Sequence, residues 1–197
     1  MSDTYYTIEH EGSAQFREKM SRFLSFAIHV TNADDARAWV KKIQNEYHDS
    51  RHVCWAYALG PKGEEWQLND NGEPSGTAGK PILGQIRSKE LTDVCVAVVR
   101  YFGGIKLGTS GLISAYREAA SLALDDAGRK ECHSMTRIAV EFPYAVADKV
   151  LKLTKSYELE VIERQFDNLC RLTADVRDSQ VDELKGRLSK VEGVVID

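Results

Sequence analysis

The hydrophobic pattern in the first part of the chain alternates between strand-like and helix-like stretches. Residues 21–30 (SRFLSFAIHV) have the composition of a strand, and residues 34–48 repeat apolar positions at the spacing of a helix. Residues 51–60 and 64–70 flank the turn residues GPKG, which predicts a β-hairpin. The pattern therefore predicts a strand, a helix and a hairpin in this order.

Two glycine-rich loops, joined by a strongly apolar strand, follow the hairpin. The density of Gly, Pro, Asn and Ser in residues 69–81 (NDNGEPSGTAGKP) excludes regular structure. Residues 82–88 are predicted to form a short helix. Residues 94–102 (VCVAVVRYF) are apolar on both faces, as a central buried strand should be, and they run into GGIKLGTSG. A long helix over residues 112–128 comes next. We interpret Asp70 to Gly111 as the functional surface of this domain.

The rest of the chain repeats the alternation at a smaller scale. Both periodicities break near residues 128–133, in the segment GRKECHS, so we predict two domains, residues 1–129 and 130–197. The second domain has strands or helices at residues 135–144, 146–157, 159–166, 169–176, 179–190 and 191–196. Their order, β-α-β-β-α-β, is the ferredoxin-like pattern, and the fold class predicted for the chain is α+β.

Composition and charge restrict the functions that this chain can have. Of its 197 residues, 43% are hydrophobic and 28% are charged, which is ordinary for a globular protein. The net charge of -4 argues against a protein that coats nucleic acid without discrimination. Residues 75–117 nevertheless carry six basic side chains and two acidic ones, so this segment is +4 within an acidic chain.

Targeting signals and cysteine usage indicate a cytoplasmic protein. The first residues, MSDTYYTIEHEG, lack the basic start, apolar run and cleavage site of a signal peptide. No apolar stretch approaches the roughly 20 residues that span a bilayer, so we expect no membrane association. The four cysteines form no CxxC pair, and we expect small buried hydrophobic residues and no structural disulfide.

The second loop has the features of an anion-binding turn. In a strand that ends in a glycine-rich turn before a helix, glycines permit close approach, and free N–H groups and the helix dipole favour negative charge. Here Arg100 and Lys106 flank Gly103, Gly104 and Gly108. These five residues are candidates for binding a phosphate or a carboxylate.

Two aromatic residues, Tyr101 and Phe102, lie beside these charges. Adjacent side chains on a strand point to opposite faces, so at least one ring should be exposed, where it can stack on a nucleobase. The alternative for either ring is that it fills the core beneath the loop. We interpret the cluster as a whole, together with Lys80 of the first loop, as a site for RNA or another anion.

The first loop does not have a known nucleotide-binding pattern. Gly76 and Gly79 enclose only two residues, and Pro81 stands where a Walker motif has its Mg²⁺-binding hydroxyl. Neither loop contains G-x-G-x-x-G or the G-x-S-x-G elbow of serine hydrolases. The residues of this loop that remain candidates are Glu73, Ser75, Gly76, Thr77 and Gly79.

An enzymatic alternative would use His52, Asp70 and Glu73 as acid, base and orienting group. Asp70 and Glu73 are more typical of turn formers and loop caps, so these three residues are only weak catalytic candidates. His52 and Cys54 share a strand face and could begin a metal site, but no second pair completes it. We predict no metal and no cofactor.

Several segments of the chain occur in the same order in one known family. They are KMSRF (19–23), HVCWAY (52–57), DNGEPSGTAGKPIL (70–83), VVRYFGGIKLGTSGL (98–112) and AYREAA (115–120). Over its whole first domain the chain closely resembles the YigZ/IMPACT family. Ser110 stands where relatives commonly have Gly, which removes some backbone freedom from the second loop.

The resemblance implies both a fold and a link to translation. It implies a first domain like the fourth domain of elongation factor G, with a fold shared by a small-subunit ribosomal protein, and a ferredoxin-like second domain like the factor's fifth. Eukaryotic relatives regulate translation through a kinase pathway, with an extra N-terminal domain. The resemblance implies that this chain is of the bacterial YigZ type. The kinase-pathway role of the eukaryotic relatives is therefore not expected of it.

Three functional hypotheses follow. The first is a non-enzymatic RNA-binding protein linked to translation or the ribosome. The second is an enzyme that acts on a small phosphorylated or carboxylated metabolite. The third is a protein-interaction module that forms a homodimer through the second domain. If Arg100, Lys106 and Lys80 converge on an open groove beside an exposed ring, binding is favoured; if Asp70, Glu73 and His52 converge in a closed pocket, catalysis is favoured.

Overall fold

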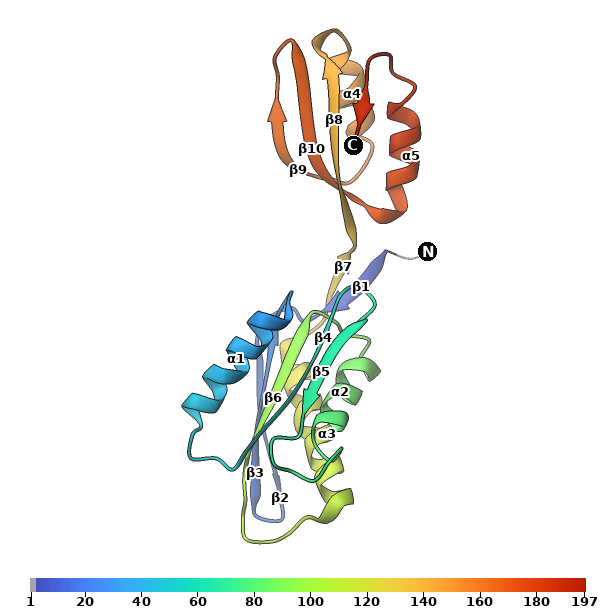
Figure 1. Ribbon diagram of the computed structural model, residues 1–197. Helices are drawn as coiled ribbons and strands as arrows, with labels where there is room; N and C mark the ends of the chain where they lie inside the picture. Colours follow the sequence, from blue (N-terminus) through green and yellow to red (C-terminus); the bar gives the residue numbers. More distant parts are fainter. Residues whose placement is uncertain (1–2) are drawn as a thin grey trace. The chain divides into compact units, whose positions relative to one another are not determined.

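A computed structural model describes residues 3–197 (Figure 1). The chain divides into two compact units, one formed by residues 5–132 and the other by residues 133–197 with Asp3 and Thr4. The predicted boundary lies three residues before this division. Asp3 belongs to the second unit because its carboxylate accepts hydrogen bonds from Arg177 at 3.0 Å and from the Ser179 hydroxyl at 2.6 Å.

The first unit is built on a five-stranded antiparallel sheet with the strand order β2-β3-β6-β4-β5. Its strands are β2 (Gly12–Glu18), β3 (Ser21–His29), β4 (His52–Leu59), β5 (Glu65–Asn69) and β6 (Val94–Tyr101). The predicted strand, hairpin and central strand are confirmed. Strand β2 was not predicted, because only two apolar side chains, Ala14 and Phe16, alternate with the polar residues of GSAQFRE.

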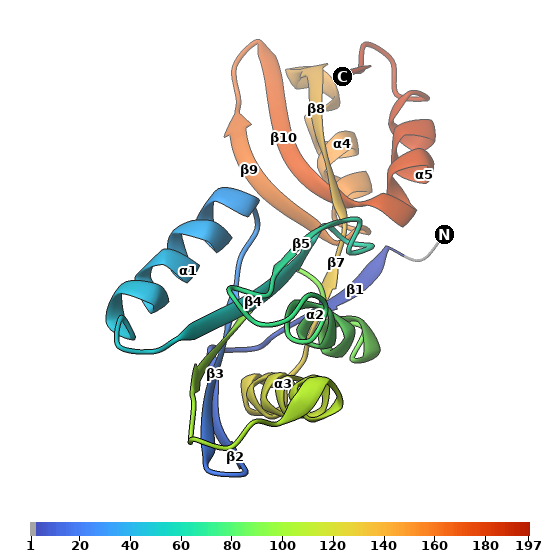
Figure 2. The same ribbon diagram turned by 60° about the horizontal axis from the view of Figure 1, so that its bottom comes forward.

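Three helices cover this sheet on its two faces. Helices α2 (Gly79–Ser88) and α3 (Gly108–Ala127) pack on one face, and α1 (Ala33–Glu46) packs on the other (Figure 2). Strand β6 is buried on both sides: Val94, Val96 and Val98 belong to the core under α2 and α3, and the alternate residues belong to the core under α1. Burial of both faces, as predicted, therefore explains the continuous apolar run of β6.

A separate two-stranded sheet pairs β1 (Thr4–Thr7) with β7 (Lys130–His133). Neither strand was predicted, since each has only four residues and β7 falls in the segment where the periodicity breaks. In the second unit, an antiparallel sheet has the order β11-β8-β10-β9. Its elements are β8 (Met135–Pro143), the 3₁₀ turn η1 (Tyr144–Val146), α4 (Ala147–Thr154), β9 (Leu159–Gln165), β10 (Leu169–Arg177), α5 (Asp178–Leu188) and β11 (Val195–Ile196).

The elements of the second unit follow in the predicted order, and the unit has its own core. Val140 and Phe142 of β8 pack with Leu172 of β10 and with Leu184 and Leu188 of α5. The four cysteines are free thiols; Cys54, Cys95 and Cys170 are buried as predicted, whereas Cys132 is only partly buried. Among the described residues, no helix is both long and apolar enough to cross a membrane.

The loop after β6 is fixed to the sheet by a close backbone contact. The β2–β3 turn consists of Lys19 and Met20, which both have positive φ, at 43° and 70°. Gly103 lies against this turn, and a Cβ added there would stand only 2.0 Å from the Met20 carbonyl carbon. Only glycine permits this approach, so the turn and the loop after β6 form one packed end of the sheet.

We expect Gly103→Ala to destabilise the first unit by about 2 kcal/mol or more, because the methyl group meets backbone that can move only with the turn. Urea denaturation followed by tryptophan fluorescence measures this effect. Trp39, Trp55 and Trp66 are the three tryptophans of the chain, so the signal reports the first unit alone.

The matched control is Gly84→Ala in α2, where an added Cβ meets nothing within 4 Å. A helical Gly→Ala change should stabilise by about 0.5–1 kcal/mol. Equal urea midpoints for Gly103→Ala and the wild type would contradict the close-packing account.

Candidate functional site

The first loop is organised around the carboxylate of Asp70. Its two oxygens accept backbone hydrogen bonds from Gly76 at 2.8 Å, Ala78 at 3.1 Å and Gly79 at 2.8 Å, where α2 begins. Burial raises the pKa of Asp70, but the three N–H donors outweigh it and the net shift is downward. Asp70 thus acts as a loop and helix cap.

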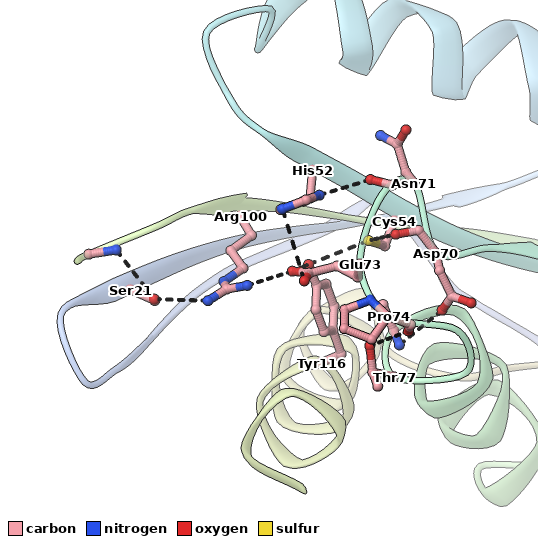
Figure 3. Close-up of polar contacts among 12 residues, drawn as sticks. Ser21, His52, Cys54, Asp70, Asn71, Glu73, Pro74, Thr77, Arg100 and Tyr116 are labelled. Carbon is pink, nitrogen blue, oxygen red and sulfur yellow. Dashed lines mark hydrogen bonds and ion pairs between the residues drawn. The ribbon is translucent and has the colours of Figure 1, made fainter. Parts of the chain in front are cut away.

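A buried ion pair joins this loop to the central strand. The Glu73 carboxylate accepts hydrogen bonds from the Arg100 guanidinium and from the Tyr116 hydroxyl, each at 2.7 Å (Figure 3). The Glu73 and Arg100 side chains are only 3% and 6% exposed. His52 Nε2 lies 4.0 Å from the other Glu73 oxygen, and its Nδ1 is 2.9 Å from the Asn71 carbonyl. Since a carbonyl only accepts, Nδ1 is the donor in that bond.

Cys54 and Tyr116 complete the buried network as neutral groups. The Cys54 thiol donates to the Asp70 carbonyl at 2.9 Å and lies 3.4 Å from the Tyr116 hydroxyl. Burial strongly raises the pKa of both the Cys54 thiol and the Tyr116 phenol. Neither group is therefore an activated nucleophile at neutral pH.

Beside this network lies an open cavity of about 450 Å³. Glu73, Arg100, Leu107 and Leu112 are buried residues of its wall, and the exposed residues of its wall include Arg51, Phe102, Lys106 and Thr109. Gly108, the first residue of α3, also borders it. The cavity therefore combines cations, an aromatic ring and the amino end of a long helix.

A second cavity, of about 440 Å³, shares Phe102 with the first. It is lined by the β2–β3 turn and by the end of β6, and its residues are Arg17, Glu18, Lys19, Met20, Arg22, Tyr101 and Phe102. The Phe102 ring is 43% exposed and Met20 is 77% exposed. We call the surface formed by Arg17, Lys19, Met20, Arg22, Arg51, Phe102 and Lys106 the basic end of the sheet.

The structure brings part of the predicted second-loop site together. Arg100, Phe102, Lys106 and Gly108 line the first cavity, together with His52 and Glu73. Tyr101 lines the second cavity, where its hydroxyl donates to Asp49 at 2.7 Å and its ring lies under Arg22. Gly103 packs against the β2–β3 turn, and Gly104 has a φ of 90°, a backbone conformation that favours glycine. Arg100 lies in the buried network instead of on the open surface.

Most of the predicted residues of the first loop line neither cavity. Lys80 is exposed on α2 beside Gly76 and lines neither cavity. Thr77 is buried and donates to the Pro74 carbonyl at 2.6 Å, and Ser75 is exposed. Gly76 and Gly79 provide the N–H groups that hold Asp70. Within residues 3–197, no group of three His, Cys, Asp or Glu side chains is arranged to hold a metal ion.

Four cations of the basic end, Arg17, Lys19, Arg22 and Arg51, lie outside the +4 segment and were not among the predicted residues. For Arg17, Lys19 and Arg22 the signal that could have found them is the β2–β3 hairpin. Its register sets Arg17 opposite Arg22, and Arg22 in turn lies opposite Tyr101 of β6. Of the +4 segment itself, Arg87 stacks on Trp66 and Lys89 pairs with Asp125, away from both cavities.

Comparisons with known proteins agree with the family resemblance found in this chain's motifs. Residues 19–124 match the family model for the Impact N-terminal domain. The IMPACT family member YvyE of Bacillus subtilis is 35% identical over 166 residues, covering 84% of this chain and 73% of that protein. The chain belongs to the IMPACT family. The family member YigZ of Escherichia coli is 31% identical over 173 residues, covering 87% of this chain and 85% of YigZ.

A solved structure also matches this IMPACT family chain along its length. It is titled "Crystal structure of an hypothetical protein", is 26% identical, and aligns with a TM-score of 0.74 over 100% of this chain and 97% of its own. The resemblance found in the sequence is therefore confirmed at the level of the family, and the mixed α and β fold at the level of the structure.

Glu73→Gln is expected to destabilise the first unit by about 3 kcal/mol, because it leaves the Arg100 charge buried without a counter-charge. Urea denaturation by tryptophan fluorescence measures the loss, with the exposed Glu118→Gln in α3 as the matched control. Adding Arg100→Met to Glu73→Gln should recover part of the stability. A single Glu73→Gln variant as stable as Glu118→Gln would contradict the role of the ion pair.

Asp70→Asn should lower stability by about 2 kcal/mol at pH 7, because the carboxylate accepts charge-assisted bonds from three amides. The lowered pKa of Asp70 means that its contribution is present above its ordinary value of 3.8 and is lost as the pH falls below it. Urea midpoints at pH 7, 5, 4 and 3 should therefore converge for the two proteins at the acid end. A constant difference down to pH 3 would contradict this.

Proposed function

We propose that this protein is a non-enzymatic RNA-binding protein connected with translation, and that the basic end of the sheet holds single-stranded RNA. The observation that carries the proposal is the exposed ring of Phe102, which borders two cavities lined by Arg17, Lys19, Arg22 and Lys106. Cations contact phosphates, and an exposed ring stacks on an unpaired base. A single strand offers both groups at once.

The fold and the family support the link to translation. We propose that the first unit is like the fourth domain of elongation factor G and that the second is ferredoxin-like. The strand order β11-β8-β10-β9 supports the second assignment, because the β-α-β-β-α-β chain forms one antiparallel sheet. A cytoplasmic protein with RNA or the ribosome as its partner fits these assignments.

The geometry favours binding over the enzymatic alternative. Two of the three weak catalytic candidates make structural contacts: Asp70 accepts from three backbone amides, and one Glu73 oxygen accepts from Arg100 and Tyr116. The other Glu73 oxygen lies 4.0 Å from His52 Nε2, so the three residues do not form a hydrogen-bonded acid and base pair. One observation supports a homodimer through the second unit. The edge strand β9 exposes Ile162, and Phe166, just after this strand, is also exposed.

The proposal predicts that Phe102→Ala weakens binding of a 12-nucleotide single-stranded RNA about tenfold, as loss of one stacked base should. Fluorescence anisotropy with labelled RNA measures the affinity. Trp66→Ala is the matched control, because Trp66 is also an exposed ring beside an arginine, Arg87, but lies away from both cavities. This control should bind as the wild type does.

The same titrations at several salt concentrations test the phosphate contacts. Lys106→Gln should reduce the slope of log K against log salt by about 0.7, the value for one phosphate contact on a single strand. Lys89→Gln, whose amine pairs with Asp125, should leave the slope unchanged. Equal affinity and slope for Phe102→Ala, Lys106→Gln and the wild type would remove the basic end from the binding site.

A further inference from the structure

The first cavity has a charge suited to a doubly charged anion. Arg51, Arg100 and Lys106 line it as cations, and Glu73 is its one carboxylate, so the lining carries +2 with the histidine taken as neutral. The Glu73 charge is partly offset within the wall, because Arg100 and Tyr116 both donate to one of its oxygens. A phosphate monoester carries about -2 at pH 7.

The amino end of α3 adds hydrogen-bond donors to the same cavity. The helix begins at Gly108 without a side-chain cap and without an acidic residue in its first turn. The first N–H groups of a helix have no partner within it, and they carry a partial positive charge. Gly108 and Thr109 border the cavity, so these amides lie at its wall.

Arg100 provides a second, independent observation that points to a ligand. Its side chain is 6% exposed and lines the cavity, and its Nε is buried without a hydrogen-bond partner among the described residues. The terminal nitrogens are occupied by Glu73 at 2.7 Å and by Ser21 at 3.5 Å. A buried N–H without an acceptor is costly, and an anion seated on the guanidinium would lower that cost.

We propose that this cavity binds a terminal phosphate monoester, with the attached nucleoside on Phe102. The phosphate lies beside the Arg100 guanidinium, between Arg51, Lys106 and the first amides of α3. The source of the phosphate is a mononucleotide or the phosphorylated end of a single-stranded RNA. For the RNA end, the inference rests on the RNA binding proposed above.

A terminal phosphate fits better than one within a strand. The cavity is closed on one side by the buried residues Glu73, Arg100, Leu107 and Leu112, and the exposed residues Arg51, Phe102 and Lys106 line its open side. A phosphodiester within a strand carries one negative charge and is linked to a nucleoside on each side. A terminal phosphate monoester carries a second negative charge and is linked to a nucleoside on one side only. A volume of about 450 Å³ lies within the usual range for a small-molecule site.

The experiment compares anisotropy of 12-nucleotide RNAs that differ only in a 5′-phosphate or a 5′-hydroxyl, and of a second pair that differs at the 3′ end. The wild type should bind one phosphorylated form about tenfold more tightly than its hydroxyl form. Adenosine 5′-monophosphate, adenosine 3′-monophosphate and inorganic phosphate are tested alone by shift of the melting temperature. At least one monophosphate should raise it, and adenosine should not.

Thr109→Asp is the decisive variant, because a carboxylate in the first turn of α3 favours the helix and repels the phosphate. It should fold and lose the preference for the phosphorylated end. Thr31→Asp, the same change before α1 at the other end of β3, is the matched control and should keep the preference. Arg51→Gln, an exposed position, should reduce the preference in the same way.

The outcomes separate this inference from the proposed function. Equal binding of phosphorylated and hydroxyl RNA, with no monophosphate raising the melting temperature, would overturn the phosphate site and leave RNA binding in place. A melting shift by a monophosphate without RNA binding would support the site and contradict the RNA proposal. A preference that persists in both Thr109→Asp and Arg51→Gln would place the terminal phosphate elsewhere and overturn the inference.

Discussion

The ion pair between Glu73 and Arg100 fixes the relation between the two glycine-rich loops. It joins the first loop to the central strand β6 with both side chains buried, where a single unpaired charge would be strongly destabilising. The same guanidinium lies 3.5 Å from Ser21, whose hydroxyl also accepts from the Gly103 amide at 3.4 Å. The position of the loop after β6 on the β2–β3 turn therefore depends on a buried charge pair.

Much of the fold could be predicted from the sequence because local patterns carry it. The apolar run of β6, the glycine-rich loops and the order of elements in the second unit are all readable without tertiary information. Strands β2, β1 and β7 are not: β2 has only two apolar side chains, Ala14 and Phe16, and β1 and β7 have four residues each and pair with each other across a long stretch of chain. The segment Asp70 to Gly111 supplies both loops and the Asp70, Glu73 and Arg100 side chains of the buried network, whereas the other members come from β4 and α3.

The charged surface was harder to predict than the fold. A count along the chain gives +4 for residues 75–117, but folding divides these cations: Arg100 is buried, Arg87 stacks on Trp66 and Lys89 pairs with Asp125. The cations that surround Phe102 come largely from the β2–β3 hairpin and from Arg51. Linear charge density does not identify such a surface, because strand pairing selects which side chains become neighbours.

Chemical-shift mapping locates the RNA on the protein residue by residue. Backbone amide spectra of ¹⁵N-labelled protein would be recorded while single-stranded RNA is added. If RNA binds at the basic end of the sheet, the largest shift changes will fall on Met20, Arg22, Arg51 and the residues from Phe102 to Thr109. Shift changes confined to the second unit, with those amides unmoved at saturating RNA, would contradict binding at this surface.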